Sequence, residues 1–242
     1  MLLTPIRNVL RPIFGHVESM LVRVLPGTTA NLLQTYAPDW TNYYVVAERS
    51  IEDEWNEIIW PQIKDFDFDT VLELAPGWGR NTERLCEYAK KLYAVDFKST
   101  AIEGCRARLG DSFKNCDLVY AINNGKDLRI IGTDSISTIY CWDSAVHFSR
   151  EILASYMSEF ERVLKPGGKG FVHHANMGAG AGKNIKARPH WRSNVTKEFV
   201  SQLCHQYGLT VVAQTDIAWA EITDCATVFT KPVRTRSDSS AA

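Results

Sequence analysis

A short segment in the first third of the chain constrains its fold more than any other feature. Residues 71–85 read Val-Leu-Glu-Leu-Ala-Pro-Gly-Trp-Gly-Arg-Asn-Thr-Glu-Arg-Leu, an apolar run that breaks at glycines and resumes as a helical pattern near Asn81. A strand, a glycine turn and a helix in this order form a nucleotide-binding turn. Glycine lets the backbone approach a ligand, and the helix begins with N–H groups that have no partner inside it. The segment therefore predicts a nucleotide-type ligand at the carboxyl end of a strand.

The spacing within this turn separates two classes of cofactor. An acid, Glu73, is followed by Ala75, Gly77 and Gly79 at alternate positions, whereas dinucleotide-binding turns carry Gly-x-Gly-x-x-Gly. The alternate spacing resembles the first motif of the class I S-adenosylmethionine-dependent methyltransferases, with Ala75 where that family usually has its first glycine. The resemblance implies that these four residues and Asn81 bind S-adenosyl-L-methionine.

A second acid, Asp96, ends the next apolar run, Lys91–Val95. An acid roughly twenty residues past the glycines, at the end of the second strand, is placed to accept hydrogen bonds from both ribose hydroxyls of a nucleotide. This holds for S-adenosylmethionine and for a nicotinamide cofactor alike. Asp96 therefore strengthens nucleotide binding without choosing between the two.

Two asparagines follow the third expected strand, in the sequence Asn123-Asn124-Gly125. In the resembled family an acid or amide just past this strand meets the adenine amino group, which makes Asn124 the candidate and Asn123 the next choice. Ordinary turn chemistry explains Asn-Asn-Gly equally well. The predicted cofactor set is completed by two aromatic residues that follow the second and fourth strands, Phe97 and Trp142.

From Thr70 onward, strands and helices alternate regularly. The expected strands are 71–74, 91–95, 116–121, 135–141 and 169–173, and the expected helices are 82–89, 99–109, 151–163 and 196–208. Such alternation predicts an α/β, doubly wound, Rossmann-like parallel sheet with helices on both faces. Lys165-Pro166-Gly167-Gly168 is a helix stop before the fifth strand and a second point of resemblance to class I methyltransferases.

The last two expected strands, 210–219 and 222–230, are joined by a very short turn and therefore form an antiparallel hairpin. They bring the sheet to seven strands, the class I methyltransferase topology. A dinucleotide-binding half would instead end in a parallel sixth strand, so the hairpin disfavours a nicotinamide cofactor.

A chain of 242 residues fits one large domain with an appendage. We expect an N-terminal helical extension or lid over residues 1–65, an S-adenosylmethionine-binding methyltransferase domain over 66–232, and a flexible tail over 233–242. The net charge of -1 gives no electrostatic case for a nucleic-acid partner. The six cysteines include no Cys-x-x-Cys pair, which indicates a reducing compartment. We therefore expect a cytoplasmic protein.

Residues 1–26 carry apolar residues at helical spacing with interspersed arginines, interrupted by Pro5 and Pro12. One interpretation is an amphipathic segment in peripheral contact with a membrane surface. The other, which we favour because the basic residues are few, is a helix packed on the domain or across a homodimer interface. Residues 27–65 are rich in aromatic side chains, with helical spacing from Val45 to Ile59. Tyr43 and Tyr44 are candidate substrate-binding residues, unless these rings are simply core.

A narrower likeness concerns the acceptor. The sequences Trp142-Asp143-Ser-Ala-Val-His147, His173-His174-x-Asn176 and His190-Trp191-Arg192, with Asp224, resemble a bacterial methyltransferase group whose members often accompany glycosyltransferases. The likeness implies O-methylation of a sugar or glycan hydroxyl. His190 and Arg192 would then bind an acidic or phosphorylated glycan, since arginine suits carboxylate and phosphate. A solvated basic loop is the alternative.

Candidate catalytic residues lie just past the fourth and fifth strands. Asp143 and His147 share a face if their segment is helical, and the carboxylate would then orient the imidazole as a general base. His174 is a second candidate base, because strand alternation sends only one of His173 and His174 towards a given face. In the alternatives, His147 only packs against the cofactor, and Asp143 binds the methionyl amino group or, with Asp216 and Asp224, a metal. No spacing demands a metal, and we predict none.

Two other function classes remain beside the methyltransferase. One is a nicotinamide-dependent oxidoreductase, which the motif spacing and the closing hairpin disfavour. The other is a binding protein that keeps the fold without catalysis, and Ala75 and Asn124 are the departures that leave it open. The intact Glu73 and Asp96 favour a working cofactor site.

Overall fold

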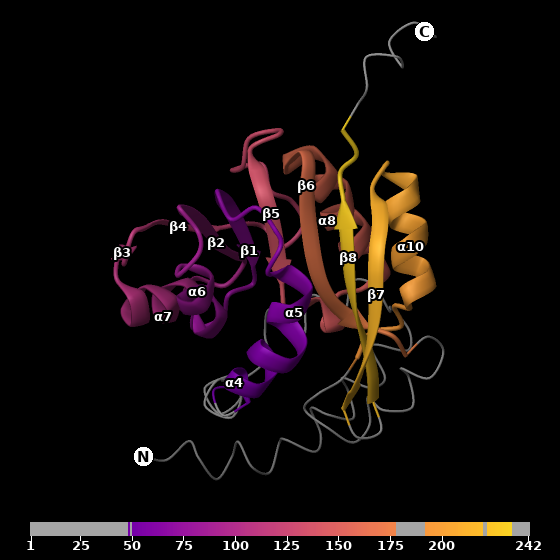
Figure 1. Cartoon of the computed structure of the whole chain (residues 1–242), viewed down its shortest axis with the longest axis horizontal. Coiled ribbons are helices and arrows are strands. Elements are labelled where there is room, and N and C mark those ends of the chain that lie inside the picture. The colour runs from indigo at the N-terminus through magenta and orange to yellow at the C-terminus, as the bar shows by residue number, and fades with distance from the viewer. Residues whose placement is uncertain (1–47, 49, 178–191, 220–221, 234–242) are drawn as a thin grey trace, which may run out of the picture.

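The computed structural model describes residues 48, 50–177, 192–219 and 222–233 of the chain (Figure 1). The expectations for residues 1–26, for Tyr43, Tyr44 and His190, and for the tail after Val233 lie outside the described residues. None of the helices in the described part is long and apolar enough to cross a membrane.

The core of the structure is one eight-stranded sheet with the strand order β3-β4-β2-β1-β5-β6-β8-β7 (Figure 1). The strands are β1 (Thr70–Leu74), β2 (Lys91–Asp96), β3 (Ser112–Phe113), β4 (Cys116–Ile122), β5 (Ile136–Cys141), β6 (Leu164–Ala175), β7 (Thr210–Trp219) and β8 (Ile222–Thr230). Neighbours from β4 to β6 pair in parallel, whereas β8 pairs antiparallel with both β6 and β7. The expected doubly wound sheet with a closing hairpin is confirmed.

The sheet differs from the expectation at two places. The eighth strand is β3, a two-residue strand paired antiparallel with β4, too short to leave a period in the sequence. The second difference is that β6 begins at Leu164, directly after the preceding helix, so Pro166, Gly167 and Gly168 lie inside the strand. The helix stop is correct, but the glycines belong to the first part of β6, where Gly167 N–H donates to Lys231 O at 2.7 Å.

Helices cover both faces of the sheet. They are α4 (Ile51–Asp53), the π-helical turn η1 (Glu54–Ile59), α5 (Trp60–Ile63), α6 (Arg80–Leu85), α7 (Ser99–Leu109), the 3₁₀ turn η2 (Ala145–His147), α8 (Arg150–Val163) and α10 (Lys197–Gln206). α8 and α10 pack on one face, and η1 to α7 pack on the other. Alternation along β1 sends Leu72 and Leu74 to the first face and Val71 to the second, so one strand serves both cores.

The strand order places the site. From β1 the chain moves outward to β2 and β4, then returns to β5 on the other side of β1. The parallel strands end at one edge of the sheet, and such a reversal leaves a crevice there because the following connections diverge. The residues that end β1, β2, β4 and β5 therefore meet at this crevice.

Candidate functional site

A pocket opens at the crevice, and its lining comes mainly from the ends of β1, β2 and β5 and from the segments that follow these strands. Ten of the predicted site residues line it: Glu73, Ala75, Gly77, Asn81, Asp96, Phe97, Asn124, Trp142, Asp143 and His147. The residues that sequence reasoning did not single out include Glu48, Trp78, Arg80, Lys98, Phe148 and Tyr156. Gly79, Asn123, His174 and Arg192 are not part of the lining.

The glycine turn forms the floor of the pocket. Three alternate residues are in the left-handed region, Ala75 at φ 59°, Gly77 at φ 57° and Gly79 at φ 84°. The Ala75 N–H donates to Val95 O at 2.7 Å and ties the turn to β2. A side chain at Gly79 would come within 2.7 Å of Cys105 Sγ, so this glycine serves the packing of the turn against α7. The turn thus presents backbone at positions 75 and 77 to the pocket.

Two buried acids stand beside the turn. Burial raises the pKa of Glu73 to about 7, although Thr82 Oγ1 donates to its carboxylate at 2.6 Å. Burial likewise raises the pKa of Asp96 to about 6, although Asp96 accepts hydrogen bonds from the backbone N–H groups of Lys98, at 2.9 Å, and of Phe97 and Gly77. Both acids are at most 6% exposed. Each carboxylate therefore lacks the donors that would compensate fully for its burial.

Asn81, in the first turn of α6, adds an unpaired acceptor to the same wall. Its side chain is 4% exposed, and its Oδ1 has no hydrogen-bond partner among the described residues. A buried acceptor without a partner costs free energy that a bound ligand with a suitable donor would recover. This wall therefore carries a buried acceptor that a donor of a bound ligand could satisfy.

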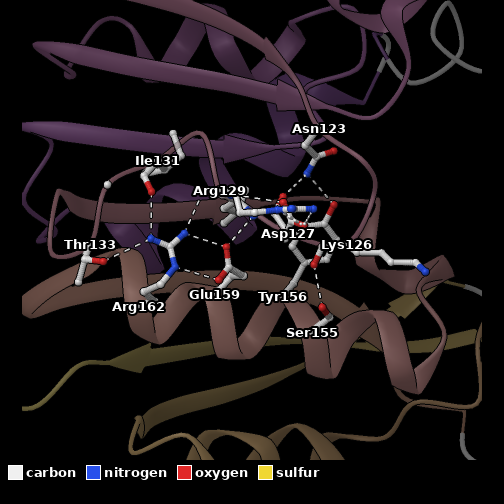
Figure 2. Close-up of polar contacts among 12 residues, drawn as sticks. Asn123, Lys126, Asp127, Arg129, Ile131, Thr133, Ser155, Tyr156, Glu159 and Arg162 are labelled. Carbon is white, nitrogen blue, oxygen red and sulfur yellow. Dashed lines mark hydrogen bonds and ion pairs between the residues drawn. The ribbon is translucent and has the colours of Figure 1, made fainter.

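The loop between β4 and β5 forms another rim of the pocket. Asn124 lines the pocket, but its Oδ1 accepts from the N–H groups of Lys126 and Asp127 at 2.9 and 3.0 Å, and its Nδ2 donates to Asp127 Oδ2 at 2.7 Å. Asn123 Nδ2 donates to Asp127 O and to Tyr156 Oη, both at 2.9 Å (Figure 2). Both asparagine side chains therefore hold the loop in shape.

Side chains of α8 fasten this loop from below, as Figure 2 shows. Glu159 accepts from Leu128 N–H at 2.7 Å, and Arg162 donates to the carbonyls of Leu128 and Ile131 at 2.9 and 3.0 Å. Ser155 Oγ donates to Lys126 O at 2.8 Å. An irregular segment is thereby fixed by side chains that satisfy its backbone groups.

The far wall of the pocket belongs to the segment after β5. Asp143 has φ 54° and accepts from Arg80 Nη2 at 3.3 Å, and Arg80 also pairs with Glu54 of the N-terminal helices at 3.6 Å. Glu54 is 7% exposed and accepts from Trp142 Nε1 at 2.8 Å. Glu54, which precedes β1 in the chain, thus stabilises the wall formed by the segment that follows β5.

His147 lines the same wall, but not by the route expected. The segment is not an α-helix, because Asp143 is left-handed and only Ala145–His147 form the 3₁₀ turn η2. Asp143 and His147 therefore share the pocket without sharing a helix face.

The two remaining predicted residues lie behind this wall. His174 is fully buried in β6, where its Nε2 contacts Thr227 Oγ1 at 2.7 Å and burial lowers its pKa to about 4. Arg192 is 6% exposed and donates from Nε to Asp224 Oδ2 at 2.9 Å. Neither side chain lines the pocket, so any role in the acceptor site would be indirect in this conformation.

The residues missed from the sequence differ in the signal they offered. Arg80 follows Gly79 at the start of α6, so its place in the turn marks it as a pocket residue. Glu54 gave no signal, since its partners Arg80 and Trp142 stand far along the chain. Across the part of the chain that the structure describes, no three His, Cys, Asp or Glu residues are grouped to hold a metal ion.

Known proteins share this architecture. A family model described as a methyltransferase domain matches residues 71–168. Phosphoethanolamine N-methyltransferase 1 of Triticum aestivum is 27% identical over 139 residues, which are 57% of this chain and only 28% of the wheat protein.

Solved structures with the same fold include three instructive ones. An S-adenosylmethionine-dependent methyltransferase of Clostridium acetobutylicum superposes with a TM-score of 0.62 at 15% identity, over 80% of this chain and 100% of that chain. A protein of Pyrococcus horikoshii gives 0.60 at 21% identity, over 76% and 90%. The [4+2]-cyclase SpnF also gives 0.60, at 13% identity, over 78% and 82%.

The chain therefore has the class I methyltransferase fold, and its residues 71–168 match a model of a methyltransferase domain. The Clostridium enzyme, by its name, depends on S-adenosylmethionine. The residues present fit this group. Its ribose hydroxyls and its amino group are donors, and the pocket offers the under-satisfied acceptors Glu73, Asp96 and Asn81. Gly77, left-handed in the floor, leaves backbone without a side chain facing the ligand.

Proposed function

We propose that this protein transfers a methyl group from S-adenosylmethionine to a hydroxyl of a sugar, a glycan or another small molecule. One observation carries the proposal. A single pocket joins donor-poor acceptors on the β1–β2 side, Glu73 and Asp96, to Asp143 and His147 on the β5 side. Glu73 and Asp96 suit the cofactor, and Asp143 and His147 suit an acceptor hydroxyl that gives up its proton.

The cofactor side follows from the strand order. If Asp96 accepts from the ribose hydroxyls, the loop after β4 would lie on the adenine side and the residues after β1 and β5 on the methionyl side. Asn81 and Glu73 would then accept from the methionyl amino group. When bound, the cofactor supplies an electrophilic methyl group, and the residues around it hold and orient the two reactants.

On the acceptor side, a neutral hydroxyl gains from a base that takes its proton, an effect of roughly 10²–10⁴-fold. Asp143 and His147 both line the pocket on this side. We assign the carboxylate of Asp143 to orient the hydroxyl and His147 to accept its proton. His174, which lies outside the pocket lining and whose pKa burial lowers to about 4, is the weaker candidate base.

A second candidate is methyl transfer to a small amine. It is favoured by the likeness to the wheat phosphoethanolamine N-methyltransferase, over 57% of this chain. An amine acceptor would meet the carboxylates of Asp143 and Glu48 and the Trp142 ring, all in the lining. The likeness to a [4+2]-cyclase is a reminder that the fold alone does not fix the reaction.

The described part of the N-terminal segment supports a role as a lid. Glu48 lines the pocket and pairs with Arg108 of α7 at 2.5 Å, and Glu52 pairs with Arg84 of α6. With the buried Glu54 on Arg80, three acids of this segment face three arginines of the helices beside the pocket. We extend the proposal to residues 1–65 as the lid and 66–232 as the catalytic domain.

Calorimetric titration with S-adenosylhomocysteine tests the cofactor assignment. We expect micromolar binding to the wild type and a loss of at least about 100-fold in Asp96→Ala, since two charge-assisted hydrogen bonds contribute about 1.5–3 kcal/mol each. Asp117→Ala is the matched control, because this exposed acid pairs with Lys91 at the opposite end of the strands. Binding of a nicotinamide dinucleotide, or of neither compound, would overturn the assignment.

An acceptor panel then separates the two candidate reactions. Sugars with free hydroxyls, a phosphorylated sugar and phosphoethanolamine are each incubated with S-adenosylmethionine, and methylated products are measured by mass spectrometry. Methylation of phosphoethanolamine alone would replace the hydroxyl acceptor by the amine. Cofactor binding with no methylated product in any reaction would favour a non-catalytic role.

A further inference from the structure

Behind the far wall lies a group of polar side chains outside the pocket lining. His173 in β6 and Asp224 in β8 are both 0% exposed. The two strands pair antiparallel, and Asp224 stands two places along β8 from the residue opposite His173. Buried ionisable groups so close together are expensive unless each meets a partner, so their contacts carry information.

The contacts of the His173 ring indicate which of its nitrogens carries the proton. Its Nδ1 accepts from the backbone N–H of Asp143 at 3.2 Å, and its Nε2 lies 3.4 Å from Asp224 Oδ2. A nitrogen that accepts an N–H has no proton of its own, so the proton is on Nε2 and faces the carboxylate. The Trp142 ring stacks on the imidazole at 4.2 Å and fixes its plane.

Asp224 is the anchor of the group. Burial alone would raise its pKa, but the contact with His173 and the hydrogen bonds and charge of Arg192 lower it instead. Arg192 donates from Nε and pairs through Nη2 with this carboxylate at 2.9 Å each, and the same Nη2 lies 4.0 Å from Asp143 Oδ1. The buried Asp224 carboxylate therefore orients two side chains, His173 and Arg192, that both contact Asp143.

We propose that His173 and Asp224 are positioning residues that fix Asp143 at the acceptor end of the pocket. His173 holds the backbone N–H of Asp143 in its left-handed conformation, and Asp224 fixes the tautomer of His173 and, through Arg192, the direction of the Asp143 carboxylate. The assignment of this end of the pocket to the acceptor rests on the proposed function. The contacts that run from Asp224 through His173 to Asp143 do not depend on it.

The first test needs no variant and no cofactor. Long-range ¹⁵N–¹H correlation spectra of the full chain labelled in histidine report the protonation of each ring nitrogen. We expect His173 to carry its proton on Nε2, with Nδ1 bare. A proton on Nδ1, in the other tautomer or in the imidazolium, would overturn the proposal, because Nδ1 could not then accept from Asp143.

Two substitutions separate the two bonds of His173. The amide of His173→Asn lies near Nδ1 and offers an oxygen to Asp143 N–H, whereas the amide of His173→Gln lies near Nε2 and offers a donor to Asp224. We expect the Asp143 amide resonance to keep its position in the Asn variant and to move in the Gln variant. Equal behaviour of the two folded variants would overturn the assigned order. If neither folds, the tautomer in the wild type decides.

S-adenosylhomocysteine titration keeps this proposal distinct from the proposed function. We expect both His173 variants to bind within about twofold of the wild type, since His173 lies behind the acceptor wall. A loss of 10-fold or more in both would assign His173 to the cofactor side and overturn its role at Asp143. Failure of the wild type to bind would refute the cofactor site alone, because the tautomer and the Asp143 resonance are measured without cofactor.

Discussion

The two sides of the pocket bury carboxylates in opposite ways. On the β1–β2 side, burial raises the pKa of Glu73 to about 7 and that of Asp96 to about 6. On the β6–β8 side, Asp224 is buried as deeply, yet its pKa is lowered, because His173 and Arg192 outweigh the burial. Buried carboxylates near the carboxyl ends of the parallel strands thus lack compensating partners on the β1–β2 side and are paired with Arg192 on the β6–β8 side.

This difference separates carboxylates that a ligand can satisfy from carboxylates that hold neighbouring residues in place. Acids without enough donors lower the stability of the free protein and gain from a ligand that brings donors. Acids already paired with arginine offer a ligand little, but they hold neighbouring groups in place. The cofactor side is of the first kind, and the support behind Asp143 is of the second.

The largest expected effect comes from breaking the partnered side. Asp224→Ala leaves Arg192 buried without its partner, and breaking a buried pair in this way costs about 3–5 kcal/mol. Urea denaturation measures the free energy of unfolding. The double variant Asp224→Ala/Arg192→Met should lose less, because no charge is left alone. A loss below about 1 kcal/mol in the single variant would contradict the contrast between the two sides.

A pH series sharpens the contrast on the under-satisfied side. Burial raises the pKa of Glu73 from its ordinary value of 4.5 to about 7, so the folded state holds this proton more tightly than the unfolded state. Its contribution to stability is complete below pH 4.5 and is lost as the pH rises through 7. The free energy of unfolding of Glu73→Gln should therefore rise relative to that of the wild type between pH 5 and pH 8, by on the order of 3 kcal/mol at most.

The readout for Glu73 is the difference in unfolding free energy between variant and wild type, because other acids of the chain titrate in both. The pKa of Asp127, for instance, is lowered to about 2 by Arg129 and contributes the opposite slope. A difference that stays constant over this pH range would show that Glu73 is not under-satisfied.

The smallest expected effect tests the turn itself. Ala75 has φ 59°, which costs an L-residue about 1–2 kcal/mol, and glycine returns roughly 0.5–1 kcal/mol of that as chain entropy. Ala75→Gly should thus stabilise the protein by about 0.5–1 kcal/mol and leave S-adenosylhomocysteine affinity within about twofold. Ala154→Gly in α8 is the control and should lose about 1 kcal/mol. Destabilisation by Ala75→Gly would mean that the methyl group makes contacts worth more than the strain.

The β1–β2 side of the pocket was predictable because its signals are local. The acid, the turn and the helix start stand within residues 73–81, and Asp96 is the last residue of the next strand, β2. The closing hairpin was predicted with the bounds that the structure has, because two β-branched runs around a very short turn have one simple pairing.

Other features were not predictable, for reasons of chemistry rather than pattern. Asn124 was expected to offer its side chain to adenine, a role that stays a prediction, but both ends of its amide are occupied within its own loop. A sequence shows that an asparagine follows a strand, but not which neighbours take its hydrogen bonds. For Asp143 and His147, the expected helix gave way to a left-handed residue and a 3₁₀ turn.

The sequence by itself determined the doubly wound sheet, the glycine turn and the acids at the ends of β1 and β2, because period, turn chemistry and strand ends are properties of neighbours along the chain. Only the tertiary structure decided the far wall of the pocket. Glu54, Arg80, Asp143, Arg192 and Asp224 come from five separate parts of the chain, and hydrogen bonds across such separations depend on how the layers pack. Burial, which raises the pKa of Glu73, and the partners that lower the pKa of Asp224 in spite of burial are in place only once the chain is folded.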